Sequence, residues 1–259
     1  MSHVVVDREP SGLAWVVLDR PVRRNAMTLS MWRELRDRVV ELGRSADVRV
    51  IALTGAGDHF CAGADIGEFG EARATAVDAQ RYEDAVDACN EAIAEVAKPT
   101  IAAIRGFCLG GGCGLAMACD FRLAHSSARF AIPAARLGIV YGVRDTQNLL
   151  ALVGLAHAKR ILFTGRQIDA LEAARIGLVD EVVEGSVADA VREFAGALVE
   201  NAPLSIAGAK LILTALVRGE VRERQPDIET ALARSAASDD YREGVRAFME
   251  KRRPVFTGR

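Results

Sequence analysis

The chain has few of the residues from which metal sites, disulfide frameworks and membrane spans are built. Its 259 residues include five cysteines and four histidines, and no two cysteines form a Cys-x-x-Cys pair. This spacing favours neither a zinc site nor a disulfide framework, so we expect small buried cysteines and no metal. No apolar run approaches the length that a bilayer requires, and the N-terminal run of three valines is too short for a signal peptide. We therefore expect a cytoplasmic protein.

An excess of either charge is also missing. The chain carries 33 Lys and Arg residues against 35 Asp and Glu residues, a formal net charge of -2. Such a balance attracts neither nucleic acid nor an anionic membrane, and we expect neither as a partner. The length suits one large domain, or one domain with a small appendage, with a substantial core.

The first half of the chain alternates short β-rich runs with helical stretches, which is typical of a layered α/β domain. The strand candidates are Val4–Val6, Ala14–Leu18, Val48–Leu53, Thr100–Ile104 and Phe121–Leu123. Apolar residues at helical spacing predict a helix over 30–42 with Ser30 as its N-cap, and a second helix over 76–96.

After about residue 145 the β-signals become rare and amphipathic helices dominate the pattern. The expected helices are Ala151–Phe163, Ala170–Ile176, Ser186–Glu200, Pro203–Val217 and Asp239–Lys251. The chain is therefore expected to have an α/β core over residues 1–195 and a helical C-terminal region over residues 196–259.

A glycine-rich segment, Gly106–Gly114, is the first candidate for chemistry. It follows the strand candidate Thr100–Ile104 and precedes a helix-compatible run, so its backbone can approach a ligand and the first N–H groups of the helix have no internal partner. This is the geometry of an oxyanion hole. A P-loop is excluded because Gly-Lys-Ser/Thr is absent, and the GxGxxG register is not met. Glycines that only permit tight packing remain an alternative, although a second N–H donor can come from His59–Ile66.

Four segments carry a resemblance to a known family: Phe60–Ile66 (FCAGADI), Pro99–Asp120, Arg160–Gly177 and Tyr241–Phe256. Together with Asp19-Arg20-Pro21 and Asn25-Ala26, they resemble the enoyl-CoA hydratase/isomerase (crotonase) superfamily over essentially the whole chain. The resemblance implies an α/β fold with a crotonase-type ββα spiral core and a helical C-terminal trimerisation region. It also implies a homotrimer or a homohexamer.

The resemblance further implies an acyl-CoA thioester as the ligand, with coenzyme A as part of the substrate and no separate cofactor. The thioester oxygen would be held by the backbone N–H groups of Ala64 and Gly111. The positions that match contacts with the CoA moiety are Arg24, Ala26, Ala62, Asp65, Ile66 and Lys251.

The sequence departs from the family at its acid/base positions. Hydratases of the family use two glutamates, and the matching positions are Gly114 and Ala134. Because each acid/base group contributes about 10²–10⁴ in rate, conventional hydration is disfavoured. The acid of related isomerases and dehalogenases is replaced by Gly142, and Asp145 lies nearby but out of register.

Tyr141 occupies a position similar to that of a tyrosine beside the reacting carboxylate in methylmalonyl-CoA decarboxylase-like members. A core or rim aromatic whose hydroxyl bonds a backbone group is the alternative. Two hypotheses therefore remain. The first is an enzyme that stabilises a thioester enolate during decarboxylation, isomerisation or weak hydration through Tyr141 or Asp145. The second is a non-catalytic acyl-CoA-binding protein of the same fold.

Overall fold

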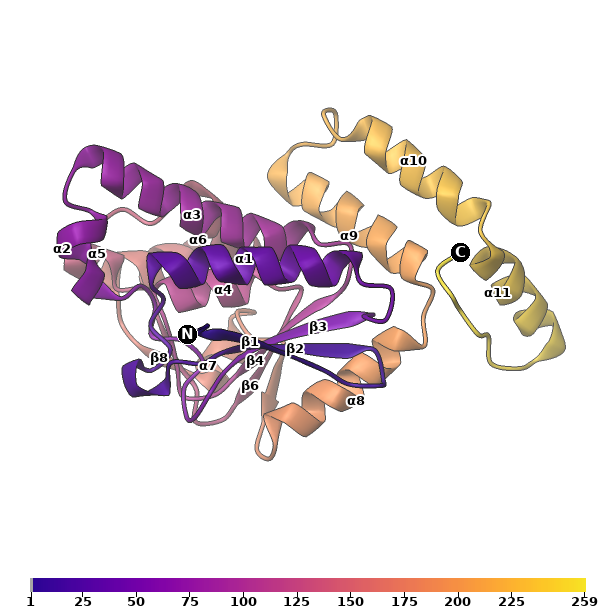
Figure 1. Cartoon of the computed structure of the whole chain (residues 1–259), viewed down its shortest axis with the longest axis horizontal. Helices are drawn as coiled ribbons and strands as arrows, with labels where there is room; N and C mark the ends of the chain where they lie inside the picture. Colours follow the sequence, from indigo (N-terminus) through magenta and orange to yellow (C-terminus); the bar gives the residue numbers. More distant parts are fainter. Residues whose placement is uncertain (1) are drawn as a thin grey trace.

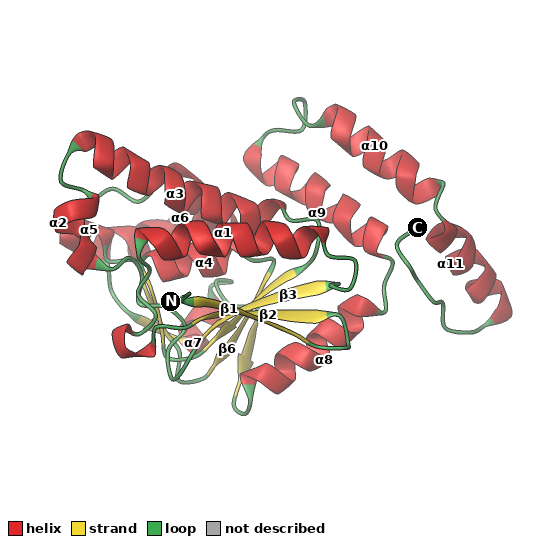
Figure 2. Ribbon diagram, in the orientation of Figure 1, coloured by secondary structure: helices red, strands yellow, loops and turns green. Residues whose placement is uncertain are grey.

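Two β-sheets lie at the centre of the structure, a computed structural model that describes residues 2–259 apart from the side chain of Glu71. Within these residues the larger sheet has the strand order β1-β2-β3-β4-β6-β9 and the smaller one the order β5-β7-β8. Helices cover both faces of the larger sheet, and three further helices extend from the core as an arm (Figures 1 and 2). The mixed α/β class with a helical C-terminal region is confirmed.

The strands are β1 (Val4–Arg8), β2 (Leu13–Leu18), β3 (Val50–Gly55), β4 (Thr100–Ile104), β5 (Phe107–Leu109), β6 (Phe121–His125), β7 (Arg129–Ala131), β8 (Ile168–Asp169) and β9 (Glu181–Val183). The α-helices are α1 (Leu29–Arg44), α2 (Phe69–Ala72), α3 (Ala76–Glu95), α4 (Gly111–Ala118), α5 (Ala134–Leu137), α6 (Val143–Thr164), α7 (Ala170–Arg175), α8 (Val187–Val199), α9 (Pro203–Arg218), α10 (Gln225–Ala236) and α11 (Asp239–Glu250). Two 3-10 helices are η1 (Pro21–Arg23) and η2 (Ile66–Glu68).

The chain repeatedly passes from the larger sheet to the smaller sheet and then into a helix. β4 is followed by β5 and α4, and β6 is followed by β7 and α5. In the turn after β3, Cys61 forms a parallel bridge with Cys108 of β5 before the chain reaches α3. Apart from the antiparallel pair β1 and β2, the larger sheet is parallel. This spiral places the loop after β3 beside β5.

The larger sheet is buried on both faces, as expected for parallel strands covered by helices. Along β4, Ala102 and Ile104 join the core under α1, α3, α4 and α6, whereas Ile101 and Ala103 pack toward α8. This alternation follows from the period of two along a strand. All five cysteines are buried and carry free thiols, which confirms their interpretation as small buried hydrophobes.

The arm consists of α9, α10 and α11 and is joined to the core by buried charges. Lys210 Nζ of α9 lies 2.7 Å from Asp120 Oδ2 and also donates to the carbonyl of Lys98. Glu95 of α3 accepts from Arg224 at 2.6 Å. At the outer end of the arm, Phe248 and Met249 are 83% and 76% exposed. The arm is thus held to the core by ion pairs, and its outer end carries exposed apolar side chains.

Several element boundaries differ from those expected. Thr28, and not Ser30, caps α1, because its hydroxyl accepts from the Met31 amide at 3.2 Å. Helix α6 begins at Val143 instead of residue 151, since its N-cap is Gly142, which offers no capping side chain to read. Helix α10 and the short strands β5, β7, β8 and β9 were not expected. The expected boundary at 195/196 falls inside α8, so the arm begins with α9.

A helix that spans a bilayer must be both long and strongly apolar. Within the described part of the chain, no helix meets both conditions.

Candidate active site

Ala64 and Gly111 lie on two segments that the spiral brings into close contact. Met27 donates to the Gly63 carbonyl and accepts from the Asp65 amide, each at 2.8 Å. This parallel bridge to Ala64 leaves the Ala64 N–H unused. The approach is close enough to require glycine at residue 63: φ is +94° there, and a Cβ would lie 2.7 Å from the Leu109 carbonyl oxygen and 3.2 Å from the Gly111 nitrogen.

Gly111 is the first residue of α4, where a backbone N–H has no partner inside the helix. A Cβ built on Gly111 would lie 3.6 Å from the Ala64 nitrogen, which shows how near the two amides are. Neither amide donates a hydrogen bond to another of the described residues. Two unpaired N–H donors therefore lie side by side at the N-terminus of a buried helix.

Comparison with known proteins shows the family of this chain. Residues 8–259 match the family model described as enoyl-CoA hydratase/isomerase. The chain belongs to the enoyl-CoA hydratase/isomerase family. It is 37% identical over 262 residues to the short-chain-enoyl-CoA hydratase of Clostridium acetobutylicum, covering 98% of this chain and 97% of that protein. It is 36% identical over 258 residues to the crotonyl-CoA hydratase of Syntrophomonas wolfei, covering 98% of each.

Solved structures agree with the family assignment. An enoyl-CoA hydratase/isomerase family protein from Hyphomonas neptunium has a TM-score of 0.94 at 38% identity, covering 100% of this chain and 98% of that one. An enoyl-CoA hydratase from Bacillus anthracis has a TM-score of 0.91 at 32% identity, covering all of both chains. The crotonase fold and the membership expected from the motifs are confirmed.

Within this family member, the surroundings of Gly114 hold a carboxyl group that the sequence pattern did not place there. Gly114 is buried in α4, and a Cβ on it would lie 2.8 Å from Asp145 Oδ2. Asp145 comes from the first turn of α6 and is only 5% exposed. Asn90 of α3, which is 3% exposed, donates from Nδ2 to Asp145 Oδ1 at 2.9 Å.

Burial raises the pKa of Asp145 from 3.8 to about 6, and the nearby charge of Asp87 raises it as well. The hydrogen bond from Asn90 and the nearby hydroxyl of Tyr141 oppose this rise without cancelling it. The result is a buried carboxyl that changes its charge close to neutral pH. Such a group is a candidate for proton transfer.

Tyr141 lies beside the same cluster, half-buried against the core. Its hydroxyl donates to the carbonyl of Gly110 at 3.2 Å, directly before the amide of Gly111. Burial raises the pKa of Tyr141 well above its ordinary range, and the charge of Asp145 adds to this effect. The hydroxyl therefore stays protonated and donates to a backbone carbonyl. Ala134, at the start of α5, is buried and offers no polar atom in its side chain.

Five of the six positions matched to CoA contacts are brought together by the loops after β2 and β3. The Arg24 carbonyl accepts from the Ala62 amide at 3.0 Å, and Arg20 donates both to the Ala26 carbonyl and to Asp65. The hydrogen bond from Arg20 lowers the pKa of Asp65, so this ion pair stays charged. Arg24 lies over the ring of Phe107, 5.2 Å from its centroid, and the fifth position, Ile66, is 58% exposed.

The sixth position, Lys251, is not part of that group within one chain. It follows α11 with a left-handed backbone, φ 54°, and α11 lies at the outer end of the arm (Figure 1). The fold therefore separates Lys251 from the loops that hold Arg24 and Asp65.

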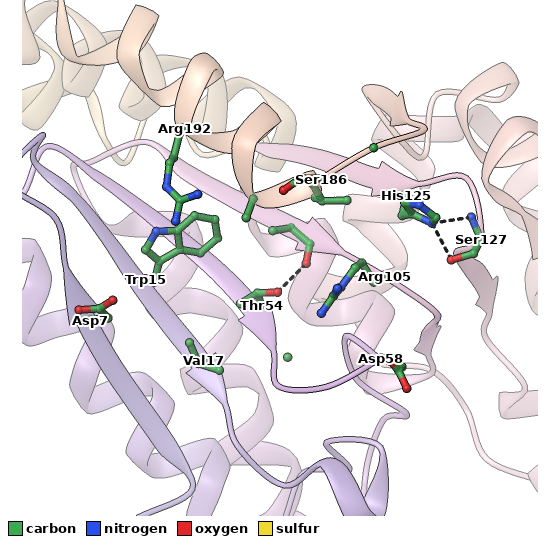
Figure 3. A pocket seen from close by; sticks show the side chains of 15 residues that line it. Asp7, Trp15, Val17, Thr54, Asp58, Arg105, His125, Ser127, Ser186 and Arg192 are labelled. Carbon is green, nitrogen blue, oxygen red and sulfur yellow. Dashed lines mark hydrogen bonds between the residues drawn. The ribbon is translucent and has the colours of Figure 1, made fainter.

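A cavity of about 730 Å³ lies elsewhere, between the larger sheet and the start of α8. Figure 3 shows Trp15 stacked under Arg192, Thr54 of β3, and His125 hydrogen-bonded to Ser127. None of the site residues expected from the sequence lines this cavity. It is thus distinct from the paired amides of Ala64 and Gly111.

The sequence analysis missed Asn90 and noted Asp145 only as out of register. Asn90 carries a signal that is readable in retrospect, since it is a polar residue on the buried face of α3 alongside Tyr82, Val86 and Ile93. A polar residue in such a stripe predicts a buried partner. The identity of that partner depends on the start of α6, which the pattern did not indicate.

Proposed function

We propose that the protein is an acyl-CoA enzyme that stabilises a thioester enolate with the backbone N–H groups of Ala64 and Gly111. The observation that carries this proposal is the adjacency of two unpaired amide donors at the N-terminus of α4. Preorganised donors of this kind stabilise the charge that develops on a carbonyl oxygen, and the dipole of α4 adds to the effect. The family membership supports an acyl-CoA substrate.

The reaction that we propose is decarboxylation or double-bond isomerisation, in place of conventional hydration. Relatives are described as hydratases, but residues 114 and 134 here are glycine and alanine, which carry no proton-transfer group. Both proposed reactions pass through an enolate and need no second acid to activate water. Tyr141 would lie at the acyl end of the site, because its hydroxyl donates a hydrogen bond to the carbonyl of Gly110, the residue before Gly111.

We further propose that the loops after β2 and β3 bind the CoA moiety through Arg24, Ala26, Ala62 and Ile66. Asp65 would act through Arg20, which ties the two loops together at 2.6 Å. Lys251 would contribute to a CoA site only if the arm packs against a neighbouring copy. The exposed Phe248 and Met249 at the end of the arm support assembly into a trimer or a hexamer.

A non-catalytic acyl-CoA-binding protein of the same fold is the competing function. It is favoured by the absence of acidic side chains at residues 114 and 134. Incubation of the protein with enoyl-, 3-hydroxyacyl- and malonyl-type CoA thioesters, followed by mass spectrometry, separates the two. Turnover of any thioester supports the enzyme, whereas tight binding of several thioesters without turnover supports the binding protein.

A further inference from the structure

The space beside Gly114 is already occupied by a carboxyl group from another helix. A Cβ at residue 114 would meet Asp145 Oδ2 at 2.8 Å, Asp145 Cγ at 3.2 Å and Asn90 Nδ2 at 3.2 Å. Real Cβ atoms essentially never lie as close to another atom as the first of these distances. The inward position of Asp145 therefore depends on glycine at residue 114.

The carboxyl group is also well placed relative to the paired amides. Gly111 and Gly114 are three residues apart on α4 and share a face of the helix. One helical turn rises by about 5 Å, so a thioester oxygen at the Gly111 amide would set the neighbouring carbons of the acyl chain toward the carboxyl beside Gly114. Tyr141 lies close to the same part of α4, because its hydroxyl donates to the carbonyl of Gly110, the residue before Gly111.

Asn90 can hold this carboxyl in both of its protonation states. In the structure its Nδ2 donates to Asp145 Oδ1, which suits the ionised form. Its Oδ1 is buried and has no hydrogen-bond partner among the described residues. Rotation of the amide by half a turn exchanges the two atoms, so that Oδ1 can accept the O–H of the neutral carboxyl.

The groups that face Asp145 favour its neutral form over a permanent ion pair. Helix α3 presents Asp87, Glu83 and Cys89 to Asp145, whereas Cys108 of β5 and Cys113 of α4 lie near the Tyr141 hydroxyl. Arg144, the residue before Asp145, pairs instead with Glu91 at 2.7 Å. Burial accordingly raises the pKa of Asp145 to about 6, where the group can both take and return a proton at neutral pH.

We propose that Asp145 is the catalytic acid/base of this enzyme and that Asn90 is its positioning residue. The inference rests on the proposed enolate site and names its substrate class, 3-enoyl-CoA thioesters. The Asp145 carboxylate takes a proton from C2, and the electrons of that C–H bond form the dienolate. The resulting charge on the thioester oxygen is held by the amides of Ala64 and Gly111. Protonated Asp145 then returns the proton to C4, the double bond moves from C3=C4 to C2=C3, and the carboxylate is regenerated.

The test uses trans-3-hexenoyl-CoA in deuterated buffer, with Asp145→Asn and the matched charge control Asp37→Asn. Asp37 lies on the exposed side of α1, where it pairs with Arg36. The parent and the control are expected to form the conjugated thioester, detected by its ultraviolet absorbance, and to introduce deuterium at C2 or C4. Asp145→Asn is expected to lose at least 100-fold in kcat, with an unchanged dissociation constant for acetoacetyl-CoA.

The pH profile of the parent provides a readout that does not depend on any variant folding. Its kcat/KM is expected to fall below about pH 6 as Asp145 becomes protonated. Asn90→Ala should move this break upward, because the hydrogen bond from Asn90 lowers the pKa of Asp145. A shift of this break in the pH profile indicates a positioning role for Asn90, because a loss of folded protein lowers activity without moving the break.

Two results overturn the inference. One is isomerisation by Asp145→Asn within twofold of the parent, and the other is a parent that neither isomerises the 3-enoyl thioester nor exchanges its C2 protons. If such a parent still binds acetoacetyl-CoA and decarboxylates a malonyl-type thioester, the enolate site stands without Asp145 as its base. If it turns over no thioester in the panel, the proposed enzymatic function fails as well.

Discussion

Asp145 Oδ2 lies where a side chain at Gly114 would begin, 2.8 Å from the position of its Cβ. The two residues come from different helices, α6 and α4, and a side chain at residue 114 would displace the Asp145 carboxyl from its present position. A glutamate at residue 114 would therefore compete with Asp145 for the same space.

Asp145→Asn is expected to stabilise the protein at neutral and alkaline pH. A carboxyl whose pKa is raised on folding supports the folded state at low pH, and this support is lost as the pH rises from 3.8 through about 6. The rise corresponds to about 3 kcal/mol, so the variant should gain about 1–3 kcal/mol in free energy of unfolding at pH 8. Urea unfolding at pH 8 and pH 4 measures the gain, which should shrink at the lower pH. A variant that is less stable than the parent at pH 8 would instead indicate that the ionised Asp145 carboxylate stabilises the fold.

Restoring glutamates should produce hydration only when Asp145 is removed. The parent is expected to hydrate crotonyl-CoA slowly or not at all. Gly114→Glu with Ala134→Glu crowds Asp145, whereas adding Asp145→Ala frees the space beside residue 114. The triple variant should therefore hydrate at least about tenfold faster than the double variant in a spectrophotometric assay. Robust hydration by the parent would falsify the argument from residues 114 and 134.

The Gly111 amide can be tested with two substitutions that add the same Cβ. That atom would lie 3.1 Å from the Trp32 ring in both Gly111→Ala and Gly111→Pro, but only proline removes the N–H. Proline is tolerated at the first position of a helix. Turnover by Gly111→Pro should fall by about 10²–10³ below that of Gly111→Ala. Circular dichroism checks that both variants fold, and equal turnover by the two would remove Gly111 from the oxyanion hole.

Tyr141→Phe keeps the ring and its packing while removing one hydroxyl. The Gly110 carbonyl loses its donor, and Asp145 loses a neighbouring hydroxyl that lowers its pKa. We expect turnover about tenfold slower and a break in the pH profile of kcat/KM at higher pH than in the parent. Acyl-CoA affinity should change less than the rate. An unmoved break with unchanged turnover would assign Tyr141 a packing role alone.

The arm should hold the protein in a trimer or a hexamer. Phe248→Asp places a charge on the uncovered apolar end of the arm and is expected to shift the protein toward a monomer in light scattering. Val77→Asp, at an exposed position on α3, is the matched control and should keep the mass of the parent. A monomeric parent at micromolar concentration contradicts the assembly.

The local pattern predicted the elements whose stabilising residues are close in sequence. Thr100–Ile104 and the start of the helix at Ala76 were placed correctly, because a buried strand is a continuous apolar run and Thr75 provides an N-cap. The short strands β5 and β7 could not be read in this way. Each has three residues, and they exist because they pair with each other across the spiral, at Cys108 and Phe130.

For the site, the residue types at positions 114 and 134 and the segments that carry the family's motifs could be read directly from the chain. The group that lies beside Gly114 depends on the fold. Matching by position along the chain did not align Asp145 with an acidic residue of the family. In the fold, the first turn of α6 brings the Asp145 carboxyl beside α4 and into contact with Asn90 of α3. The high pKa of this carboxyl has the same origin, because three separate elements remove it from water and no single stretch of sequence contains all of them.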